Sequence, residues 1–282
     1  TCGAQAGDGG GRAGSTWTLQ QMGVKLFGIT HGNGLFVAVG EDHTILTSSD
    51  GVYWAARSSG TDTLLRGVTY ANGLFVVVGD RGTIFTSPDG VSWTARSSGT
   101  SRGLNAVTYG NGRFVAVGWH GAILTSPDGV SWTARSLAKS LNLFGVTYAN
   151  GRFVAVGLGT ILTSPDGVSW AARSSGTNAW LRGVTYGNGL FVAVGDRGTI
   201  LTSPDEVSWA ARSSGTDTWL EDVTHGDGLF VAVGRGGTIL TSPDGVSWTA
   251  RSSGTGLNLF GVTYANGRFV AVGWDGTILT SP

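Results

Sequence analysis

The side chains best suited to catalysis or metal binding are few in this sequence and lie far apart. Cys2 is the only cysteine of the 282 residues, so the chain can form neither an internal disulfide nor a zinc site built from cysteines. His43 and His120 have no second ligand at a spacing that suits a metal ion. The other histidines, His31 and His225, stand where most copies of a repeat described below carry tyrosine. This distribution does not predict a metal centre.

Acidic side chains offer the next possible chemistry. Glu41 is followed by Asp42, and Glu221 by Asp222, and paired carboxylates are what glycoside hydrolysis requires. Neighbouring acids in loops are usually just solvated, and no glycine-rich phosphate loop leads from a strand into a helix. The sequence therefore favours a non-catalytic protein without a cofactor, and a glycosidase-like enzyme is the least favoured of three alternatives.

Tryptophan gives a stronger signal than any reactive side chain. Seven of the 11 tryptophans recur at a regular interval, and four do not: Trp119, Trp180, Trp219 and Trp274. An exposed tryptophan stacks on sugar rings or anchors a protein interface. The alternative is that each ring covers the loop next to it. We expect at least two of the four to bind a ligand, together with their neighbours His120 and Asp275.

Charge and hydropathy restrict the class of partner. The 18 basic residues balance 18 acidic ones without a basic run, so nucleic-acid binding is not expected. No apolar run approaches the roughly 20 residues that a membrane-spanning helix needs. Residues 1–14 are rich in glycine and are predicted to form a tether. Cys2 is either the lipid-bearing cysteine of an exported bacterial lipoprotein, which would place the protein outside the cell or on its surface, or a free thiol in a linker.

The elements that position these residues come from a repeat of about 39 residues. The threonine that follows Val or Ile recurs at steps of 39, 39, 39, 38, 39 and 39 residues, at Thr30, Thr69, Thr108, Thr147, Thr185, Thr224 and Thr263. In the second copy, strands are predicted over Leu65–Tyr70, Leu74–Gly79, Thr83–Ser87 and Val91–Ser97. Asn72-Gly73 between the first two strands is a strong hairpin signal, because both central residues of a type I′ turn need positive φ. Four-stranded units of this length are typical of propeller blades.

The two ends of the chain complete the ring. The seventh copy stops at Ser281-Pro282, directly after its third strand, and Ser15–Leu19 matches the fourth strand of the other copies. We therefore predict an all-β fold, a single seven-bladed β-propeller over residues 15–282 with four-stranded antiparallel blades. The N-terminal strand is expected to complete the last blade, which removes two open sheet edges.

The stretch Gly237–Trp248, Gly-Thr-Ile-Leu-Thr-Ser-Pro-Asp-Gly-Val-Ser-Trp, recurs with few changes and resembles the Asp-box (BNR-like) propellers. Within that group, which includes sialidases, the bacterial photosystem II assembly-factor-like proteins are the most similar. The turn here is one residue shorter than the usual Ser-x-Asp-x-Gly-x-x-Trp. The resemblance implies that the turn aspartates cap their turns and have a structural role: Asp89, Asp128, Asp166, Asp205 and Asp244. Glu206 replaces the turn glycine of the fifth copy, and the sequence predicts no role for it.

The same resemblance implies a scaffold or assembly role more readily than an enzymatic one. Arg66, Arg182 and Glu221 could fill part of a sialidase site, but no Phe/Tyr-Arg-Ile-Pro stretch is present and no long insertion builds a substrate cleft. The repeated tyrosines precede a uniform turn, so they are not expected near the variable loops.

Comparing the copies with one another shows where they differ. The turns between first and second strands and between third and fourth strands are nearly uniform, whereas the second–third turns and the segments that lead into each blade vary. Antiparallel order places both variable loops on one face of the ring. A third variable position lies on the innermost strands, near the expected mouth of the central channel: Phe27, Arg66, Asn105, Phe144, Arg182, Glu221 and Phe260. These side chains either form a pocket or plug the channel.

Together the patterns predict a non-catalytic recognition module that binds a glycan or a protein through the variable face. Arg66, Arg182 and Glu221 are expected to join the four tryptophans in that site. The alternative is a structural or assembly protein whose ring self-associates or docks on a larger complex. Both interpretations remain open at the level of the sequence.

Overall fold

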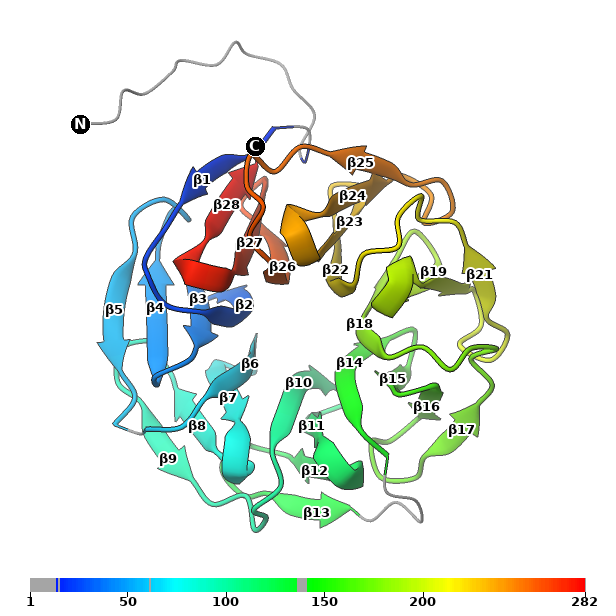
Figure 1. Cartoon of the computed structure of the whole chain (residues 1–282). Helices are drawn as coiled ribbons and strands as arrows, with labels where there is room; N and C mark the ends of the chain where they lie inside the picture. The colour runs from blue at the N-terminus through cyan, green and yellow to red at the C-terminus, as the bar shows by residue number, and fades with distance from the viewer. Residues whose placement is uncertain (1–13, 15, 61, 136–140, 282) are drawn as a thin grey trace, which may run out of the picture.

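The chain forms a seven-bladed β-propeller, as predicted. The computed structural model describes residues 14, 16–60, 62–135 and 141–281, and seven four-stranded antiparallel sheets surround a central axis (Figure 1). The predicted tether, Cys2 and the variable segment 138–140 lie outside the described residues, apart from Gly14. Among the described residues, no helix has the length and apolar character needed to cross a membrane.

Each blade runs outward from the axis in chain order. The innermost strands are β2 (Leu26–Gly32), β6 (Leu65–Ala71), β10 (Leu104–Gly110), β14 (Leu143–Ala149), β18 (Leu181–Gly187), β22 (Leu220–Gly226) and β26 (Leu259–Ala265). The second strands are β3 (Leu35–Gly40), β7 (Leu74–Gly79), β11 (Arg113–Gly118), β15 (Arg152–Gly157), β19 (Leu190–Gly195), β23 (Leu229–Gly234) and β27 (Arg268–Gly273). The third strands are β4 (Thr44–Ser48), β8 (Ile84–Ser87), β12 (Ile123–Ser126), β16 (Thr160–Ser164), β20 (Ile200–Ser203), β24 (Ile239–Ser242) and β28 (Ile278–Ser281). The outer strands are β5 (Ala55–Ser58), β9 (Thr94–Arg96), β13 (Thr133–Arg135), β17 (Ala171–Arg173), β21 (Ala210–Arg212), β25 (Thr249–Arg251) and β1 (Thr18–Gln20).

Strand β1 closes the ring by pairing with β28. Its register joins Thr18 to Thr280 and Gln20 to Ile278, so the N-terminal segment supplies the fourth strand that the seventh copy lacks. The outer strands are shorter than predicted. Trp93 and Trp17 lie just before their strands. The turn in front of Trp93 is held by hydrogen bonds to the Asp89 side chain and not by strand pairing.

The core lies between the blades and is divided into seven similar clusters. The second strand of each blade is buried on both faces, as its unbroken apolar run predicts. Between the sixth and seventh blades, Val231 and Val233 of β23 pack with Phe269 and Ala271 of β27 in one cluster, and all four side chains are fully buried. The ring is therefore stabilised by blade–blade contacts, and each blade depends on two neighbours.

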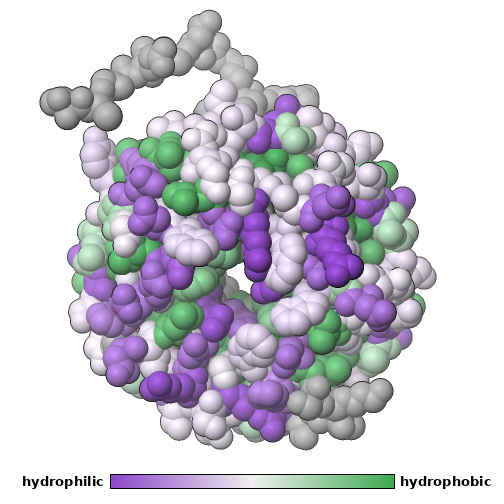
Figure 2. Space-filling view, in the orientation of Figure 1, coloured by the Kyte–Doolittle hydropathy of each residue, from purple (hydrophilic) through white to green (hydrophobic). Residues whose placement is uncertain are grey.

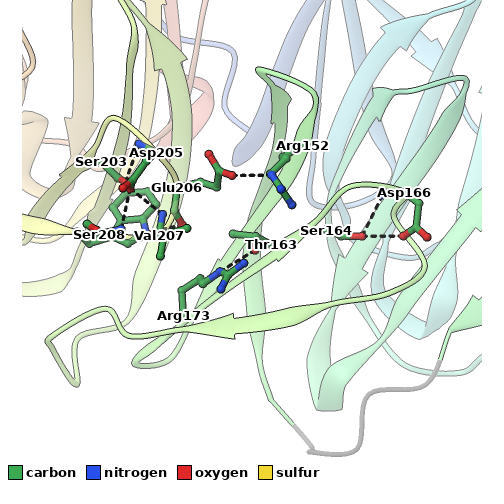
Figure 3. Close-up of polar contacts among 11 residues, drawn as sticks. Arg152, Thr163, Ser164, Asp166, Arg173, Ser203, Asp205, Glu206, Val207 and Ser208 are labelled. Atoms are coloured by element: carbon green, nitrogen blue, oxygen red, sulfur yellow. Dashed lines mark hydrogen bonds and ion pairs between the residues drawn. The ribbon is translucent and has the colours of Figure 1, made fainter.

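Aspartates cap the turns before the outer strands, as the resemblance implies. The Asp89 carboxylate accepts hydrogen bonds from the backbone N–H groups of Ser92 and Val91, both at 2.8 Å, and from the Ser87 hydroxyl at 2.9 Å. These bonds favour the ionised form and lower the pKa of Asp89 to about 2. Trp93 donates its indole N–H to the carbonyl of Gly90 at 3.2 Å. Figure 3 shows the same arrangement around Ser203 and Asp205.

Glu206 has a structural partner that the sequence did not predict. Its backbone has a φ of 57°, in the left-handed region that glycine occupies in the other turns. Its carboxylate forms an ion pair with Arg152 of the preceding blade, with 2.6 Å between Oε1 and Nε (Figure 3). The strained turn residue and the arginine therefore act as one inter-blade contact.

Candidate functional site at the channel mouth

The variable loops lie together on one face of the ring, which we call the variable face. Single-turn 3-10 helices connect second to third strands at η1 (Asp80–Gly82), η2 (Trp119–Gly121), η3 (Asp196–Gly198), η4 (Arg235–Gly237) and η5 (Trp274–Gly276). Each contacts the segment that leads into its blade: the N–H of Trp119 donates to the carbonyl of Gly103, and that of Trp274 to Asn258. The opposite, constant face carries the uniform turns, where Asn111 donates to the carbonyl of Pro165 at 3.1 Å.

A β-bulge turns one side chain of every innermost strand toward the axis. In β22, Leu220 pairs with Gly234 and Asp222 with Val233, so Glu221 is left out of the register. The skipped residue is the variable position of the sequence comparison in every blade, and a bulge re-aims the side chain of its extra residue. These seven side chains and Arg235 form the channel mouth, which encloses about 180 Å³. Figure 2 shows the opening, rimmed by strongly hydrophilic and pale aromatic groups.

Three of the four non-repeat tryptophans join one cluster at this mouth. Trp119 meets Phe144 edge-on, with 5.4 Å between ring centroids, and Trp180 stacks on the other side of Phe144 at 5.6 Å and 12°. All of these rings are half-buried. They come from the third, fourth and fifth blades, so the cluster spans blade boundaries and does not merely cover one loop.

Arg182 lies at the centre of the cluster. Its guanidinium is 5.0 Å from the ring centroid of Phe144, 5.5 Å from that of Trp180 and 5.1 Å from that of Trp219, which are cation–π distances. Burial lowers the pKa of Arg182. Its Nε is buried and has no hydrogen-bond partner among the described residues, and its closest acid, Glu221, is 3.6 Å away.

Glu221 links this arginine to a second one. Its carboxylate accepts a hydrogen bond from Nε of Arg235 at 2.9 Å, and its side chain is only 7% exposed. Arg235 also lies 3.7 Å from the ring centroid of Trp219, so that ring contacts two guanidinium groups. We call Trp119, Phe144, Trp180, Arg182, Trp219, Glu221 and Arg235 the aromatic–arginine cluster.

The remaining predicted site residues lie outside the aromatic–arginine cluster. Arg66 forms an ion pair with Asp80, with 2.6 Å between Nε and Oδ1. Trp274 is 45% exposed and carries Lys25 Nζ 4.7 Å from its ring centroid. Asp275 and His120 are exposed at the middle of their 3-10 turns. The structure thus brings five of the nine predicted residues into the cluster and a sixth, Arg66, to the channel mouth beside it. His120, Trp274 and Asp275 lie on loops of the variable face outside the cluster.

Sequence reasoning missed two residues near this cluster. Arg235 lies in a turn between second and third strands, and the only signal for it in the sequence was that this position varies among the copies. Asp222 was weighed only as a partner for Glu221, although the other copies have glycine or alanine at its place in the repeat, and that departure was the available signal. Burial raises the pKa of Asp222 to about 7, against two backbone hydrogen bonds that lower it. His31 and His225 pack edge-on or tilted against Phe36 and Phe230, as the repeated tyrosines do.

Within the described ranges, no group of three or more His, Cys, Asp or Glu side chains is arranged to hold a metal ion. Comparison with protein-family models gives no match, and neither does comparison with curated proteins. Solved structures do match. The chain superimposes on YCF48 bound to a D1 peptide with a TM-score of 0.78 at 17% identity, covering 94% of each chain. For YCF48 from Cyanidioschyzon merolae the TM-score is 0.74 at 18% identity, covering 94% of this chain and 98% of that one.

An enzyme is also among the structural neighbours. A catalytically inactive variant of virginiamycin B lyase from Staphylococcus aureus, with quinupristin, gives a TM-score of 0.85 at 12% identity, covering 94% of this chain and 99% of that one. At these identities the comparisons show the seven-bladed fold alone. The site must therefore be interpreted from its own side chains.

Proposed function

We propose that this protein is a non-catalytic recognition module that binds a protein segment through the variable face. One observation carries the proposal: the tryptophans that depart from the repeat all lie on that face, and three of them share the aromatic–arginine cluster at the channel mouth. Tryptophan and arginine are the residues that most often dominate protein interfaces. A neighbour of the same fold, YCF48, is described as bound to a D1 peptide, which supports a protein ligand here.

The chemistry of the cluster suits a ligand with an acidic group beside an apolar one. Arg182 has only a 3.6 Å contact with Glu221, so its guanidinium can pair with an incoming carboxylate without breaking a short ion pair. The half-buried faces of Trp180 and Trp219 on either side give apolar area for a neighbouring side chain.

A peptide array tests the proposal with matched variants. The double substitution Trp180→Ala, Trp219→Ala removes two rings of the cluster, and Tyr53→Ala removes an 81% exposed aromatic ring from a turn of the constant face. We expect peptides that bind the parent to be lost with the double variant and kept with Tyr53→Ala. Arg182→Gln, which preserves the rings, should weaken the acidic peptides among them. Peptides retained equally by all variants would place recognition elsewhere.

A glycan is the second candidate ligand, favoured by the 45% exposed ring of Trp274, which lies apart from the cluster. A glycan array on the parent and on Trp274→Ala separates this candidate from the first, because the peptide proposal predicts no effect of Trp274→Ala. The assembly alternative predicts a mass above the 29.0 kDa of one chain in light scattering. Export and lipid attachment at Cys2 stay predictions, which mass spectrometry of protein from its native source would test.

A further inference from the structure

The innermost strands present a ring of backbone N–H groups to the central channel. In every blade a two-residue turn joins the first strand to the second, so hydrogen-bonded and non-hydrogen-bonded pairs alternate from that turn. Val262, which is paired with Ala271, falls on a non-hydrogen-bonded position, and its N–H therefore points away from β27. The equivalent residue of every other blade has the same register: Ile29, Val68, Val107, Val146, Val184 and Val223.

Asp222 shows what these groups bind. Its Oδ1 accepts the N–H of Val223 at 2.8 Å, and its Oδ2 accepts the N–H of Val262 of the next blade at 2.9 Å. One carboxylate thus bridges two adjacent blades. Asp222 replaces a small residue that the other copies keep at this position: Gly28, Gly67, Ala106, Gly145, Gly183 and Gly261. The other copies have no carboxylate here, and a Cβ on Gly28 would lie 2.7 Å from the carbonyl oxygen of Arg66 in the next blade. The room for an anion therefore lies in the central channel itself.

The cavity at this level is small and has positive groups above it. It encloses about 170 Å³ and is lined by Ile29, Val68, Val107, Val146 and Val184, the five residues whose N–H groups Asp222 does not take. A water molecule occupies about 30 Å³ of liquid, so a carboxylate as small as formate or acetate fits with some of its hydration. Arg66 and Arg182 line the same cavity toward the variable face.

We propose that the central channel is a binding site for a small carboxylate anion, whose two oxygens accept N–H groups of neighbouring blades as those of Asp222 do. Four such neighbouring pairs exist between Ile29 and Val184, counted in chain order. Arg66 and Arg182 supply the positive charge that compensates the anion in a partly desolvated site. This site shares Arg182 with the peptide surface of the proposed function, but its backbone N–H groups lie in the channel and the proposal does not depend on that function.

Asp222 makes the affinity of this site depend on pH. Its charged form repels a second anion, and burial raises the pKa of Asp222 to about 7. The other charged groups around it are Glu221 on the same strand, Arg182 on β18 and Arg235 on η4, with Arg66 at the mouth. Protonation of Asp222 removes the repulsion, so the affinity should rise as the pH falls from 8 to 6.

Calorimetric titration with formate tests the proposal, at an ionic strength set by a sulfonate buffer too bulky for the channel. Asp222→Gly restores the residue of most other blades, and at pH 8 it should tighten formate binding about tenfold or more and abolish the pH dependence. The control, Asp227→Asn, removes the same charge from the turn after β22 and restores the residue of most other copies. It should leave the affinity unchanged.

Crystals of the parent grown with formate should show the anion on the N–H groups of two neighbouring blades. The proposal is overturned if neither parent nor Asp222→Gly binds formate saturably, if Asp222→Gly binds it more weakly than the parent, or if formate sits only on the arginines of the mouth. Asp222→Gly should melt within a few degrees of the parent, and Asp222→Ala, which matches Ala106, gives a second variant if it does not.

Discussion

The ion pair between Glu206 and Arg152 allows a quantitative test of how single departures from the repeat are accommodated. Between the fifth and sixth blades the same two places hold Leu190 and Gly245, and a Cβ on that glycine would lie 2.9 Å from the leucine side chain. The double variant Glu206→Gly, Arg152→Leu therefore rebuilds a contact that the protein already uses. The two single variants each leave one partner alone.

The expected effects of the two single variants are unequal. The Glu206 side chain is 10% exposed and that of Arg152 is 42% exposed. Arg152→Leu strands a mostly buried carboxylate, which costs about 3–5 kcal/mol for a fully buried pair and, with this partial exposure, about 2 kcal/mol. Glu206→Gly leaves an arginine that can return to water and relieves about 1 kcal/mol of left-handed strain, so its effect on the free energy of unfolding should be close to zero.

The double variant should therefore recover most of what Arg152→Leu loses. Urea unfolding of the four proteins gives the coupling free energy, which we expect to be roughly 1–2 kcal/mol. In thermal melts Arg152→Leu should lower the melting temperature by about 4 °C or more for a chain of this size. Additive effects, with Glu206→Gly failing to rescue Arg152→Leu, would refute the assignment of this pair as a substitute for the glycine–leucine contact.

Three further outcomes follow from the fold. Backbone hydrogen bonds lower the pKa values of Asp89, Asp205 and Asp244 to about 2, so the stability that these carboxylates contribute is present above pH 4 and is lost as the pH falls toward 2. Thermal melts between pH 5 and pH 2 should show this loss of stability. The loss should be smaller in Asp89→Asn. His225→Tyr restores the repeated residue and removes a buried ring nitrogen that has no partner among the described residues, and it should raise the free energy of unfolding by about 1 kcal/mol in urea titrations. Deleting residues 1–20 removes β1 and exposes the edge of β28. Gel filtration of the truncated chain should therefore show aggregation or a dimer, and the full chain should show no such change in its elution.

The fold could be predicted because every copy repeats the same local signals. The Asn-Gly turns, the second strand that is apolar on both faces and the additional fourth-strand sequence at Ser15–Leu19 each predict one part of a blade. The sevenfold recurrence of the blade pattern removes the ambiguity of a short apolar run. The placement of the variable loops on one face, and of the variable innermost residues near the channel, followed from the order of the strands alone. What could not be predicted was pairing across blades, such as Glu206 with Arg152, since the partners lie 54 residues apart and the other copies do not repeat this pair of residues.

Departures from the repeat differ in how fully the structure accounts for them. Glu206 is accommodated within the protein, because its charge pairs with Arg152 and its turn keeps the hydrogen bonds to the Asp205 carboxylate. Asp222 also finds partners, but it uses N–H groups that the other blades present to an open channel. The cluster around Arg182 is least complete, because a buried Nε–H and half-buried rings are left at the channel mouth. Since a buried N–H without a hydrogen bond contributes nothing to the stability of the ring, this is the position where a ligand has most to add.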